Sequence, residues 1–416
     1  MKYIITGGKK LEGEITVSGN KNAIFPCVAA ALLTDDEVVL ENVSDLSDSR
    51  VLIKILSSLG VEIKKTSSQL TINASSLKGS ALPKDLMTKL RGSIVLVGAL
   101  LGRLGKVKFY HPGGDIIGQR SINTHLEGFK SLGANYKKND LEYSLNFRQN
   151  RKNTKIFLAE ASVTATENLI LAAALGKGRV IIRNYAKEPH VLDLCKMLSK
   201  MGGKISQVGD RLEITGVPKL HGVKYKLGCD FIEMGTYLVA GAISGGEITI
   251  KGLDQGDLNP VLEPLKRFNL RIRKNLGSIT VLKSNLKAVP RLQTNIWPGF
   301  PTDLMSAAIV LATQSKGVTL CHDWMYESRM FFVDKLISMG AQIILADPHR
   351  SLVYGPTKLR GRILDTPDIR AGMALVLAAL VAKGESVISQ AELIERGYED
   401  VYGKLKKLGA IIQRID

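Results

Sequence analysis

Basic residues stand at the starts of otherwise apolar segments of this sequence. Lys21 opens KNAIFPCVAAALL, Arg91 opens RGSIVLVGALLG, and Arg370 opens RAGMALVLAALV. If these segments are helices, the helix dipole opposes a cation in the first turn, so each cation needs another favourable interaction. Two explanations stay open: the cation binds an anionic ligand at the helix end, or it forms a structural ion pair. We favour the ligand.

Three more arginines precede amphipathic segments at comparable positions. Arg120, Arg329 and Arg396 occur in GQRSINTHLEGF, ESRMFFVDKL and ERGYEDVYGKL. A single arginine of this kind is more often part of a surface ion pair. Three of them, together with Arg370, indicate a site that binds phosphate and carboxylate through bidentate contacts. At roughly 1.5–3 kcal/mol for each buried charge-assisted hydrogen bond, such a cluster would hold a small di- or trianion firmly.

Acidic residues accompany these cations. Asp303 lies near the start of the apolar segment in PTDLMSAAIVLA, and Glu233 near the start of FIEMGTYLVAGAI, where we interpret it as a capping or dipole-matching group. The loop HPGGDIIGQR, residues 111–120, carries Asp115 among three glycines. Flexible glycines beside one titratable side chain suggest a lid that brings an acid over a substrate. A solvated turn would have the same composition.

The elements that must position these residues recur about every 70 residues. One recurring pattern is an amphipathic helix, then a turn residue that tolerates positive φ, then a short strand. Its turn residues are Gly60, Gly133, Gly202, Asn269, Gly340 and Gly409. A second pattern, with the same period, is a more apolar helix, a turn and a β-branched strand. Its turn landmarks are Asp36, Gly105, Gly178, Gly246, Gly317 and Gly384.

Six copies of this unit predict an α/β fold with two lobes of three copies each. The apolar helices would lie inside each lobe and the strands outside, which makes each lobe an inside-out α/β barrel. The N-terminal strand segment, residues 3–17, could complete the lobe made by the last three copies. We therefore expect lobe one to comprise residues 1–20 and 228–416, and lobe two residues 21–227, including the loop 111–120.

Aligning the copies shows that polar or charged residues share one repeat position in five of the six copies. Fourteen residues before the second set of landmarks, the sequence has Asn22, Arg91, Thr164, Ile232, Asp303 and Arg370. The chemistry-bearing side chains therefore stand at equivalent starts of the apolar helices.

Composition narrows the class of protein. The chain has 416 residues, 45% of them hydrophobic and 23% charged, with a net charge of +18. That surplus suits an anionic partner, but the basic residues are scattered, which favours small anions over nucleic acid. The start of the chain does not resemble a signal peptide, and no uncharged apolar run is long enough to span a membrane. Four widely separated cysteines indicate buried free thiols in a reducing compartment, so we expect a cytoplasmic protein.

Several motifs together resemble one family. SGNKNA with Lys21 and Asn22, PGGDIIGQR, SVTATENL, PGFPTD, ESR, DIRAG and ERGYE occur in the order found in UDP-N-acetylglucosamine enolpyruvyl (1-carboxyvinyl) transferases. The resemblance covers essentially the whole chain and implies the enolpyruvyl-transferase fold. It also implies transfer of the enolpyruvyl group of phosphoenolpyruvate to the 3-hydroxyl of UDP-N-acetylglucosamine, with release of phosphate. This transferase reaction is the first committed step of peptidoglycan synthesis, and so belongs to cell wall biogenesis, cell shape, the cell cycle and cell division.

The resemblance also implies roles for individual residues. Lys21, Arg120 and Arg396 match residues that grip the phosphate of phosphoenolpyruvate, and Lys21 and Arg396 count among the catalytic residues. Arg329 and Arg370 match residues that hold its carboxylate or stabilise the closed lobes.

Other matched residues concern the reacting hydroxyl and the nucleotide. Asp303 would be the base at the sugar hydroxyl, and Asn22 would orient the sugar and the reacting centre. The substrate-binding residues implied in addition are Arg91, His125, Ser162, Val163 and Met325.

Asp115 occupies the lid position at which many members have a cysteine and others an aspartate. A carboxyl group there can donate a proton only if it stays protonated, which desolvation in a closed site favours. Because fosfomycin acts by alkylating the thiol, the hypothesis that Asp115 is the acid also predicts resistance to fosfomycin.

The nucleotide segments depart from the family pattern. Ser121 replaces a proline, Asn123 an aspartate and Thr164 a glycine, while Glu160 and Phe231 stand where basic residues are common. These departures concern the acceptor, and they keep open an enzyme that acts on a different nucleotide or phosphorylated acceptor.

Four alternatives differ from this interpretation. The first is a divergent paralogue that acts on a different nucleotide or phosphorylated acceptor. The second is a shikimate 3-phosphate transferase, but that branch lacks this lid and lysine motif. An RNA 3'-phosphate cyclase would share only the fold superfamily, and a catalytically silent paralogue would not need Lys21, Asp303, Arg370 and Arg396 together. We expect no cofactor, no metal, no nucleic-acid or membrane partner, and a monomer.

Overall fold

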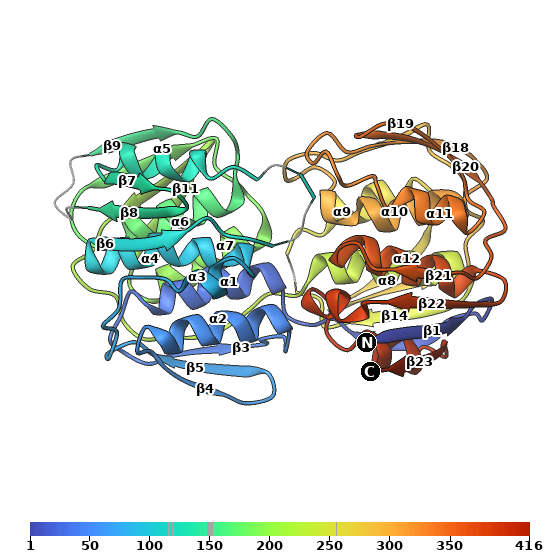
Figure 1. Cartoon of the computed structure of the whole chain (residues 1–416), viewed down its shortest axis with the longest axis horizontal. Helices are drawn as coiled ribbons and strands as arrows, with labels where there is room; N and C mark the ends of the chain where they lie inside the picture. The colour runs from blue at the N-terminus through green and yellow to red at the C-terminus, as the bar shows by residue number, and fades with distance from the viewer. Residues whose placement is uncertain (115–116, 119, 148–152, 255) are drawn as a thin grey trace. The chain divides into compact units, whose positions relative to one another are not determined.

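The computed structural model describes residues 1–114, 117–118, 120–147, 153–254 and 256–416. The chain divides into two compact units (Figure 1). Unit 1 comprises Met1–Ser18 and Cys229–Asp416 and includes the short segment at Ile117 and Gly118. Unit 2 comprises Gly19–Gly114 and Arg120–Gly228. The lobe boundaries expected from the repeat stay a prediction.

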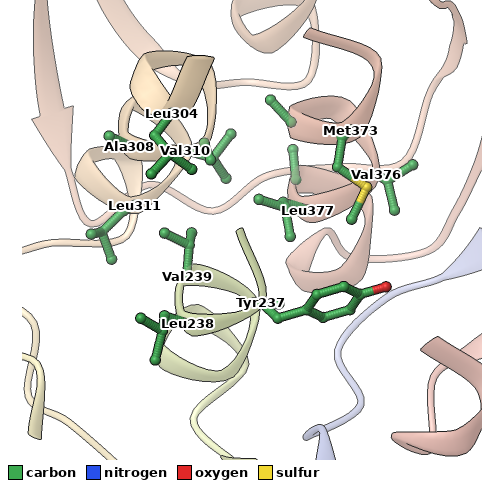
Figure 2. Packing of buried hydrophobic residues seen from close by; sticks show 14 of the residues in the cluster. Tyr237, Leu238, Val239, Leu304, Ala308, Val310, Leu311, Met373, Val376 and Leu377 are labelled. Carbon is green, nitrogen blue, oxygen red and sulfur yellow. The ribbon is translucent and has the colours of Figure 1, made fainter. Parts of the chain in front are cut away.

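Each unit has three inner helices that contact one another. They are α1 (Lys21–Ala31), α4 (Val95–Leu104) and α6 (Val163–Ala174) in unit 2, and α8 (Phe231–Ser244), α10 (Met305–Thr313) and α12 (Ile369–Val381) in unit 1. Nearly every residue of these helices is buried, because apolar side chains occur all round them rather than on one stripe. Figure 2 shows Val239, Val310 and Leu377, from α8, α10 and α12, in the resulting core of unit 1.

The outer helices are amphipathic, as the sequence predicts. They are α2 (Ser47–Ser58), α5 (Asn123–Ser131), α7 (Pro189–Lys200), α9 (Asn259–Lys266), α11 (Val333–Ser338) and α13 (Val401–Lys407), with the short α3 at Lys84–Met87. All six turn residues predicted to have positive φ do have it, from 65° at Asn269 to 100° at Gly340. The expected helix stop is therefore confirmed in every copy.

The strands form six sheets within the described residues, five of four strands and one of three. In unit 2 the sheets are β13-β3-β5-β4 (Lys224–Lys226, Val38–Glu41, Gln69–Asn73, Glu62–Lys65), β6-β8-β7 (Lys106–Tyr110, Glu142–Asn146, Asn135–Asn139) and β9-β10-β12-β11 (Thr154–Phe157, Arg179–Arg183, Arg211–Thr215, Lys204–Val208).

In unit 1 the sheets are β2-β14-β16-β15 (Glu12–Thr16, Glu247–Lys251, Ser278–Leu282, Arg271–Asn275), β17-β18-β20-β19 (Arg291–Gln293, Gly317–His322, Arg350–Gly355, Gln342–Asp347) and β21-β22-β1-β23 (Ile363–Asp365, Glu385–Ser389, Lys2–Thr6, Ile411–Ile415).

One topology recurs in these sheets. The strand that follows an inner helix pairs in parallel with an edge strand and antiparallel with the next strand, as β18 does with β17 and β20. Each inner helix packs on strands of its own repeat, for example α10 on β18 and β20. Among the described residues none of the sheets closes on itself. The inside-out arrangement is thus helices within and separate open sheets outside, not a closed β-barrel.

The N-terminal segment completes unit 1, as expected from the sequence. Strand β1 pairs antiparallel with both β22 and β23, and β2 pairs in parallel with β14. Strand β1 thus completes the sheet of the last copy, and β2 is the edge strand of the sheet that follows α8. Apart from the short segment at Ile117 and Gly118, the chain leaves unit 1 after Ser18 and returns to it at Cys229.

The inner helices begin in two ways. Four have a side-chain cap: Asn20, Ser162, Asp230 and Asp368 accept hydrogen bonds from the first backbone N–H groups of α1, α6, α8 and α12. The other two, α4 and α10, follow a short 3-10 helix, η1 (Arg91–Ile94) and η2 (Thr302–Leu304). A third 3-10 helix, η3 (Ala391–Arg396), precedes α13.

Two further properties bear on the sequence-based expectations. All four cysteines are free and buried, as predicted. Over the described residues, no helix is both long enough and apolar enough to cross a bilayer.

Candidate active site

The centre of the candidate site in unit 1 is the carboxylate of Asp303, in η2. Arg329 Nη2 donates to Asp303 Oδ1 at 3.0 Å, and Arg370 donates to Oδ2 through Nε at 3.0 Å and Nη2 at 2.9 Å. Both carboxylate oxygens are therefore held by guanidinium groups from different repeats. The structure brings together Asp303 and Arg370, which share one repeat position in two copies, and Arg329, which stands at another position.

This cluster is asymmetric in its burial. The side chains of Arg329 and Arg370 are 2% and 6% exposed, whereas that of Asp303 is 29% exposed. Burial opposes the charged form of each arginine, but the neighbouring carboxylates, above all that of Asp303, outweigh it and raise the pKa of both. The guanidinium groups are thus fixed and charged, while the carboxylate between them keeps access to solvent.

Asp368 completes the start of α12 and was not among the predicted site residues. Its Oδ1 accepts from the backbone N–H groups of Arg370 and Ala371 and lies 3.9 Å from Arg329 Nη1. An aspartate directly before an apolar helix is an N-cap signal, so the sequence did contain a pointer to it. Tyr398 packs its ring against Arg370, with 5.0 Å between the guanidinium carbon and the ring centroid, and its hydroxyl lies 3.0 Å from Thr236 Oγ1.

The remaining predicted residues of unit 1 border this cluster. Arg396 is the last residue of η3, which contacts α12. A β-carbon added to the next residue, Gly397, would lie 3.6 Å from Arg370 Nη1, so this turn lies against the start of α12. Met325 is half-buried in the segment between β18 and Arg329, and its backbone N–H donates to Asp323 Oδ1 at 3.0 Å.

In unit 2, the start of α1 carries an ion pair. Lys21 Nζ lies 2.9 Å from Asp48 Oδ2, and the two side chains are 10% and 7% exposed. Asn22 donates its backbone N–H to the cap residue Asn20 at 2.9 Å. Lys21 and Arg370 thus each form an ion pair with a carboxylate, and their role in binding an anionic ligand stays a prediction. No spacing rule connects Lys21 with Asp48, so the sequence could not have identified the partner.

A second group in unit 2 surrounds the start of α6. Ser162 caps the helix, Val163 is its first residue, and Thr164 Oγ1 lies 2.9 Å from His125 Nε2. Arg91 donates through Nη2 to the backbone oxygen of Ser121 at 3.1 Å. Burial, and then the charge of Arg91, lower the pKa of His125 to about 3, so its imidazole is neutral at physiological pH. The predicted nucleotide residues are thus neighbours, and Arg120 is half-buried directly before Ser121.

Two acids lie near this group. Glu167, in α6, is 2% exposed, and Glu188, the residue before α7, is half-buried. Burial raises the pKa of Glu167 well above its ordinary value, and the charge of Glu188 adds to the effect. Burial also raises the pKa of Glu188 to about 7. Among the described residues, Glu167 Oε1 and Glu188 Oε2 have no hydrogen-bond partner.

The predicted lid loop has glycines where close packing needs them. A β-carbon on Gly113 would lie 1.6 Å from the backbone oxygen of Thr88, and one on Gly114 2.8 Å from Arg91 Cβ. The loop thus runs directly over the turn that carries Arg91. Further along, the Ser328 N–H donates to the oxygen of Ile117 at 3.1 Å. Asp115, the predicted acid, lies outside the described residues, so its role stays a prediction.

The capping interpretation of Glu233 is wrong. Asp230 is the cap of α8, accepting from the N–H groups of Ile232 and Glu233 at 2.9 Å each. The Glu233 side chain instead accepts from the Ser18 N–H at 2.7 Å and forms an ion pair with Lys404. A residue in the first turn satisfies dipole and capping rules equally well, so only the tertiary partners separate the two roles.

Over the described part of the chain, no group of three His, Cys, Asp or Glu side chains is arranged to hold a metal ion. The candidate site residues include cations and carboxylates at helix starts. Such an arrangement can bind a small polyanion and move a proton at a carboxylate oxygen.

Comparison with known proteins defines the class. The family model of EPSP synthase (3-phosphoshikimate 1-carboxyvinyltransferase) matches residues 5–405. The solved structure of the enolpyruvyl transferase NikO from Streptomyces tendae is 25% identical, with a TM-score of 0.88 over 99% of this chain and 98% of that one. EPSP synthase from Acinetobacter baumannii, at 17% identity and a TM-score of 0.75 over 99% of this chain and 100% of that one, shares the fold. The molecule is an enolpyruvyl transferase of the EPSP synthase family.

Relatives of higher identity narrow the class further. The UDP-N-acetylglucosamine 1-carboxyvinyltransferases of Borreliella burgdorferi and Treponema denticola are 44% and 43% identical, each over 99% of this chain and 99% of their own length. The chain belongs to the UDP-N-acetylglucosamine 1-carboxyvinyltransferase family. The resemblance seen in the motifs and the predicted enolpyruvyl-transferase fold are both confirmed.

Proposed function

We propose that this chain transfers the enolpyruvyl group of phosphoenolpyruvate to the 3-hydroxyl of UDP-N-acetylglucosamine and releases phosphate, the first committed step of peptidoglycan synthesis. The observation that carries this proposal is the 44% identity, over 99% of both chains, to a UDP-N-acetylglucosamine 1-carboxyvinyltransferase. The arginine-held carboxylate at Asp303 supports it independently, because this reaction needs both an anion site and a base.

The reaction sets out what the site must supply. A proton adds to the methylene carbon of phosphoenolpyruvate, which leaves an oxocarbenium-like centre at the adjacent carbon. The sugar oxygen bonds to that centre and gives its proton to a base. The bond from the same carbon to the phosphate oxygen then breaks, and the new methyl group loses a proton, which restores the double bond. An acid and a base each contribute roughly 10²–10⁴-fold to such a reaction.

The cations account for recognition of phosphoenolpyruvate, which carries about three negative charges. We assign its phosphate to Lys21, Arg120 and Arg396, and its carboxylate to Arg329 and Arg370. Support comes from the burial of Arg329 and Arg370, whose guanidinium groups are already fixed and desolvated before a ligand arrives. A preorganised bidentate donor loses little conformational entropy on binding a carboxylate.

We assign the base role to Asp303. Its two oxygens accept from Arg329 and Arg370, but a carboxylate offers about four lone-pair positions, so a sugar hydroxyl can still donate to it. The 29% exposure of its side chain supports access by a substrate. Because the arginines fix the orientation of the carboxylate, the hydroxyl would meet an acceptor that needs no rearrangement.

The acceptor side rests on unit 2. We assign the nucleotide to Arg91, His125, Ser162 and Val163, with Met325 contributing from unit 1 and Asn22 orienting the sugar. The neutral His125, the cation Arg91 and the start of α6 offer donors and positive potential suited to a diphosphate.

A direct test measures phosphate release from phosphoenolpyruvate with UDP-N-acetylglucosamine and, in parallel, with shikimate 3-phosphate and other UDP-sugars. Release with UDP-N-acetylglucosamine alone is the expected result. Release only with another acceptor would support a divergent paralogue, and release with none would support a catalytically silent one. The product should carry a vinyl ether, which mass spectrometry detects.

Asp115 is proposed as the acid that protonates the methylene carbon. Fosfomycin alkylates a thiol, so the wild-type enzyme should keep its activity after incubation with the drug. An Asp115→Cys variant restores a thiol and should be inactivated progressively if the position lies in the site. Rapid irreversible inactivation of the wild type would contradict the proposal.

We also propose that the enzyme is a monomer and works in the cytoplasm. Four buried free thiols suit a reducing compartment. Sedimentation at micromolar concentration would test the monomer directly.

A further inference from the structure

Asp323 is a fully buried carboxylate that the proposed reaction does not use directly. It follows β18 and is 0% exposed. Its Oδ2 accepts from Thr302 Oγ1 at 2.5 Å, and its Oδ1 accepts from the Met325 N–H at 3.0 Å. Burying an ionised carboxylate is costly unless its oxygens are hydrogen-bonded, so the side chain is committed to these two partners.

The first partner leads to the proposed base. Thr302 is the first residue of η2, and Asp303 is the second. The helix start has no side-chain cap, so the Thr302 hydroxyl bond to Asp323 is a second side-chain anchor of this turn, besides the arginine bonds of Asp303. Rotation of this turn would move the Asp303 carboxylate relative to its arginines.

The second partner leads to the segment that carries Arg329. Asp323 Oδ1 fixes the backbone at Met325, four residues before Arg329. The negative charge of Asp323 also contributes to the raised pKa of Arg329, after burial, which opposes it, and the closer carboxylates of Asp303 and Asp368. Asp323 therefore contacts both segments whose side chains meet at the Arg329–Asp303 pair.

The carboxylate of Asp323 is not needed to hold the end of β18. The backbone N–H of Asp323 donates to the oxygen of His349, and its own oxygen lies 2.7 Å from His349 Nδ1. The neighbouring Trp324 donates through Nε1 to the oxygen of Thr294 at 2.9 Å. The strand end is thus anchored by other bonds, and the carboxylate is directed at the site.

We propose that Asp323 is a positioning residue that sets the orientation of the Asp303 carboxylate by holding Thr302 and the Met325 backbone at once. This inference rests on the proposed role of Asp303 as the base. It concerns the rate of the chemical step rather than binding of phosphoenolpyruvate, because Asp323 is fully buried and the phosphate and carboxylate have been assigned to other residues.

The test compares three variants of the full-length enzyme in the phosphate-release assay. Asp323→Asn removes the charge, Thr302→Val removes the hydroxyl that Asp323 holds, and Thr302→Ser restores it. Thr294→Val is the control, because it makes the same substitution at a fully buried threonine whose hydroxyl has no partner among the described residues. Thermal unfolding of each variant separates loss of fold from loss of rate.

Asp323→Asn and Thr302→Val should lower kcat by about 10- to 100-fold, since a displacement near 1 Å at a reacting group costs up to that much. The KM for phosphoenolpyruvate should change less than threefold, and Thr302→Ser and Thr294→Val should behave like the wild type.

The pH dependence of kcat gives a readout that a merely structural role would not move. The groups that face Asp303 are the cations Arg329 and Arg370. Around those cations lie Asp230, Asp323, Asp368, Tyr326 and Tyr398. Asp323→Asn removes one negative charge from this set, which favours the ionised form of Asp303. The acid limb of kcat should therefore move to lower pH, whereas Thr302→Val should leave its position unchanged.

The outcomes separate this inference from the proposed function. An unchanged kcat in both Asp323→Asn and Thr302→Val, in an active wild type, would overturn the positioning role alone. An equal loss in Thr294→Val would also overturn it, since any change in this core would then suffice. If the wild type uses another acceptor, the same variants test the role of Asp323 with that acceptor. If the wild type is inactive with every acceptor, both proposals are overturned.

Discussion

Units 1 and 2 have the same plan but opposite charges at one equivalent position. In each unit the middle inner helix follows a 3-10 turn instead of a capped start: η1 before α4 in unit 2 and η2 before α10 in unit 1. The turn in unit 2 carries Arg91 and the turn in unit 1 carries Asp303. At a capped start, one side chain accepts from the first backbone N–H groups. The two 3-10 turns have no such cap, so Arg91 and Asp303 can take part in other interactions.

The caps differ between the units in the same sense. In unit 1 the caps are the carboxylates Asp230 and Asp368, and in unit 2 they are the neutral Asn20 and Ser162. Carboxylate caps neutralise the positive helix ends and the arginines of unit 1. Neutral caps leave the helix ends of unit 2 positive. The first arrangement suits a base held among cations, and the second suits binding of a phosphorylated ligand.

Replacing Asp303 should have the largest effect on this division of roles. Asp303→Asn keeps the shape and one acceptor but removes the proton acceptor, so kcat should fall by roughly 10²–10⁴-fold. Binding of UDP-N-acetylglucosamine, followed by calorimetry, should persist because its proposed contacts lie largely in unit 2. Activity within tenfold of the wild type would mean that the base is elsewhere.

Lys21 should give the next largest effect. Lys21→Met removes a cation assigned to the phosphate, so the KM for phosphoenolpyruvate should rise roughly 10- to 150-fold, the equivalent of about 1.5–3 kcal/mol. The same change leaves Asp48 buried without this partner, which by itself destabilises the fold. The double variant Lys21→Met, Asp48→Asn relieves that second effect. If the double variant recovered a normal KM, Lys21 would be structural only.

The sequence predicted the helix ends and repeat positions of both units, but not the residues with which the site residues pair. Gly60 and Asn269 indicated helix ends, because few residue types tolerate positive φ. Arg91 and Asp303 were identified because they occupy the same position in different copies of the repeat. Asp48 and Asp323 left no such signal, since their partners, Lys21 and Thr302, come from other parts of the chain and meet only through tertiary packing. For the same reason the capping interpretation of Glu233 failed, although its position in the first turn of α8 fits the dipole-matching one. Local rules identify positions at helix starts, whereas the charge balance of a site depends on folding.

Exchanging the two kinds of cap should test whether their charge matters. Ser162→Asp keeps a capping oxygen on α6 and adds a negative charge where the diphosphate is proposed to bind. The KM for UDP-N-acetylglucosamine should rise by about 5- to 30-fold, corresponding to about 1–2 kcal/mol, with thermal stability unchanged or higher. The reciprocal Asp368→Ser should lower stability instead, because Arg329 and Arg370 lose a neighbouring carboxylate. Equal effects of both changes on nucleotide KM would remove the distinction between the units.

The smallest expected effect concerns the acids of unit 2 whose pKa is raised by burial. In unit 1, by contrast, Asp303 and Asp368 lie beside arginines. Burial raises the pKa of Glu188 to about 7 from an ordinary 4.5, so the folded state holds this proton more tightly than the unfolded state does. The stability it contributes is present below pH 4.5 and is lost as the pH rises through 7, by at most about 1.4 kcal/mol per pH unit.

Glu188→Gln mimics the protonated side chain and cannot ionise. The variant should therefore unfold at a higher temperature than the wild type at pH 8, but at nearly the same temperature at pH 4.5. Glu160→Gln, at an exposed position of the same unit, is the control and should show no such difference. A gain for Glu188→Gln that is equal at both pH values would show that the amide improves packing, and would contradict a raised pKa for Glu188.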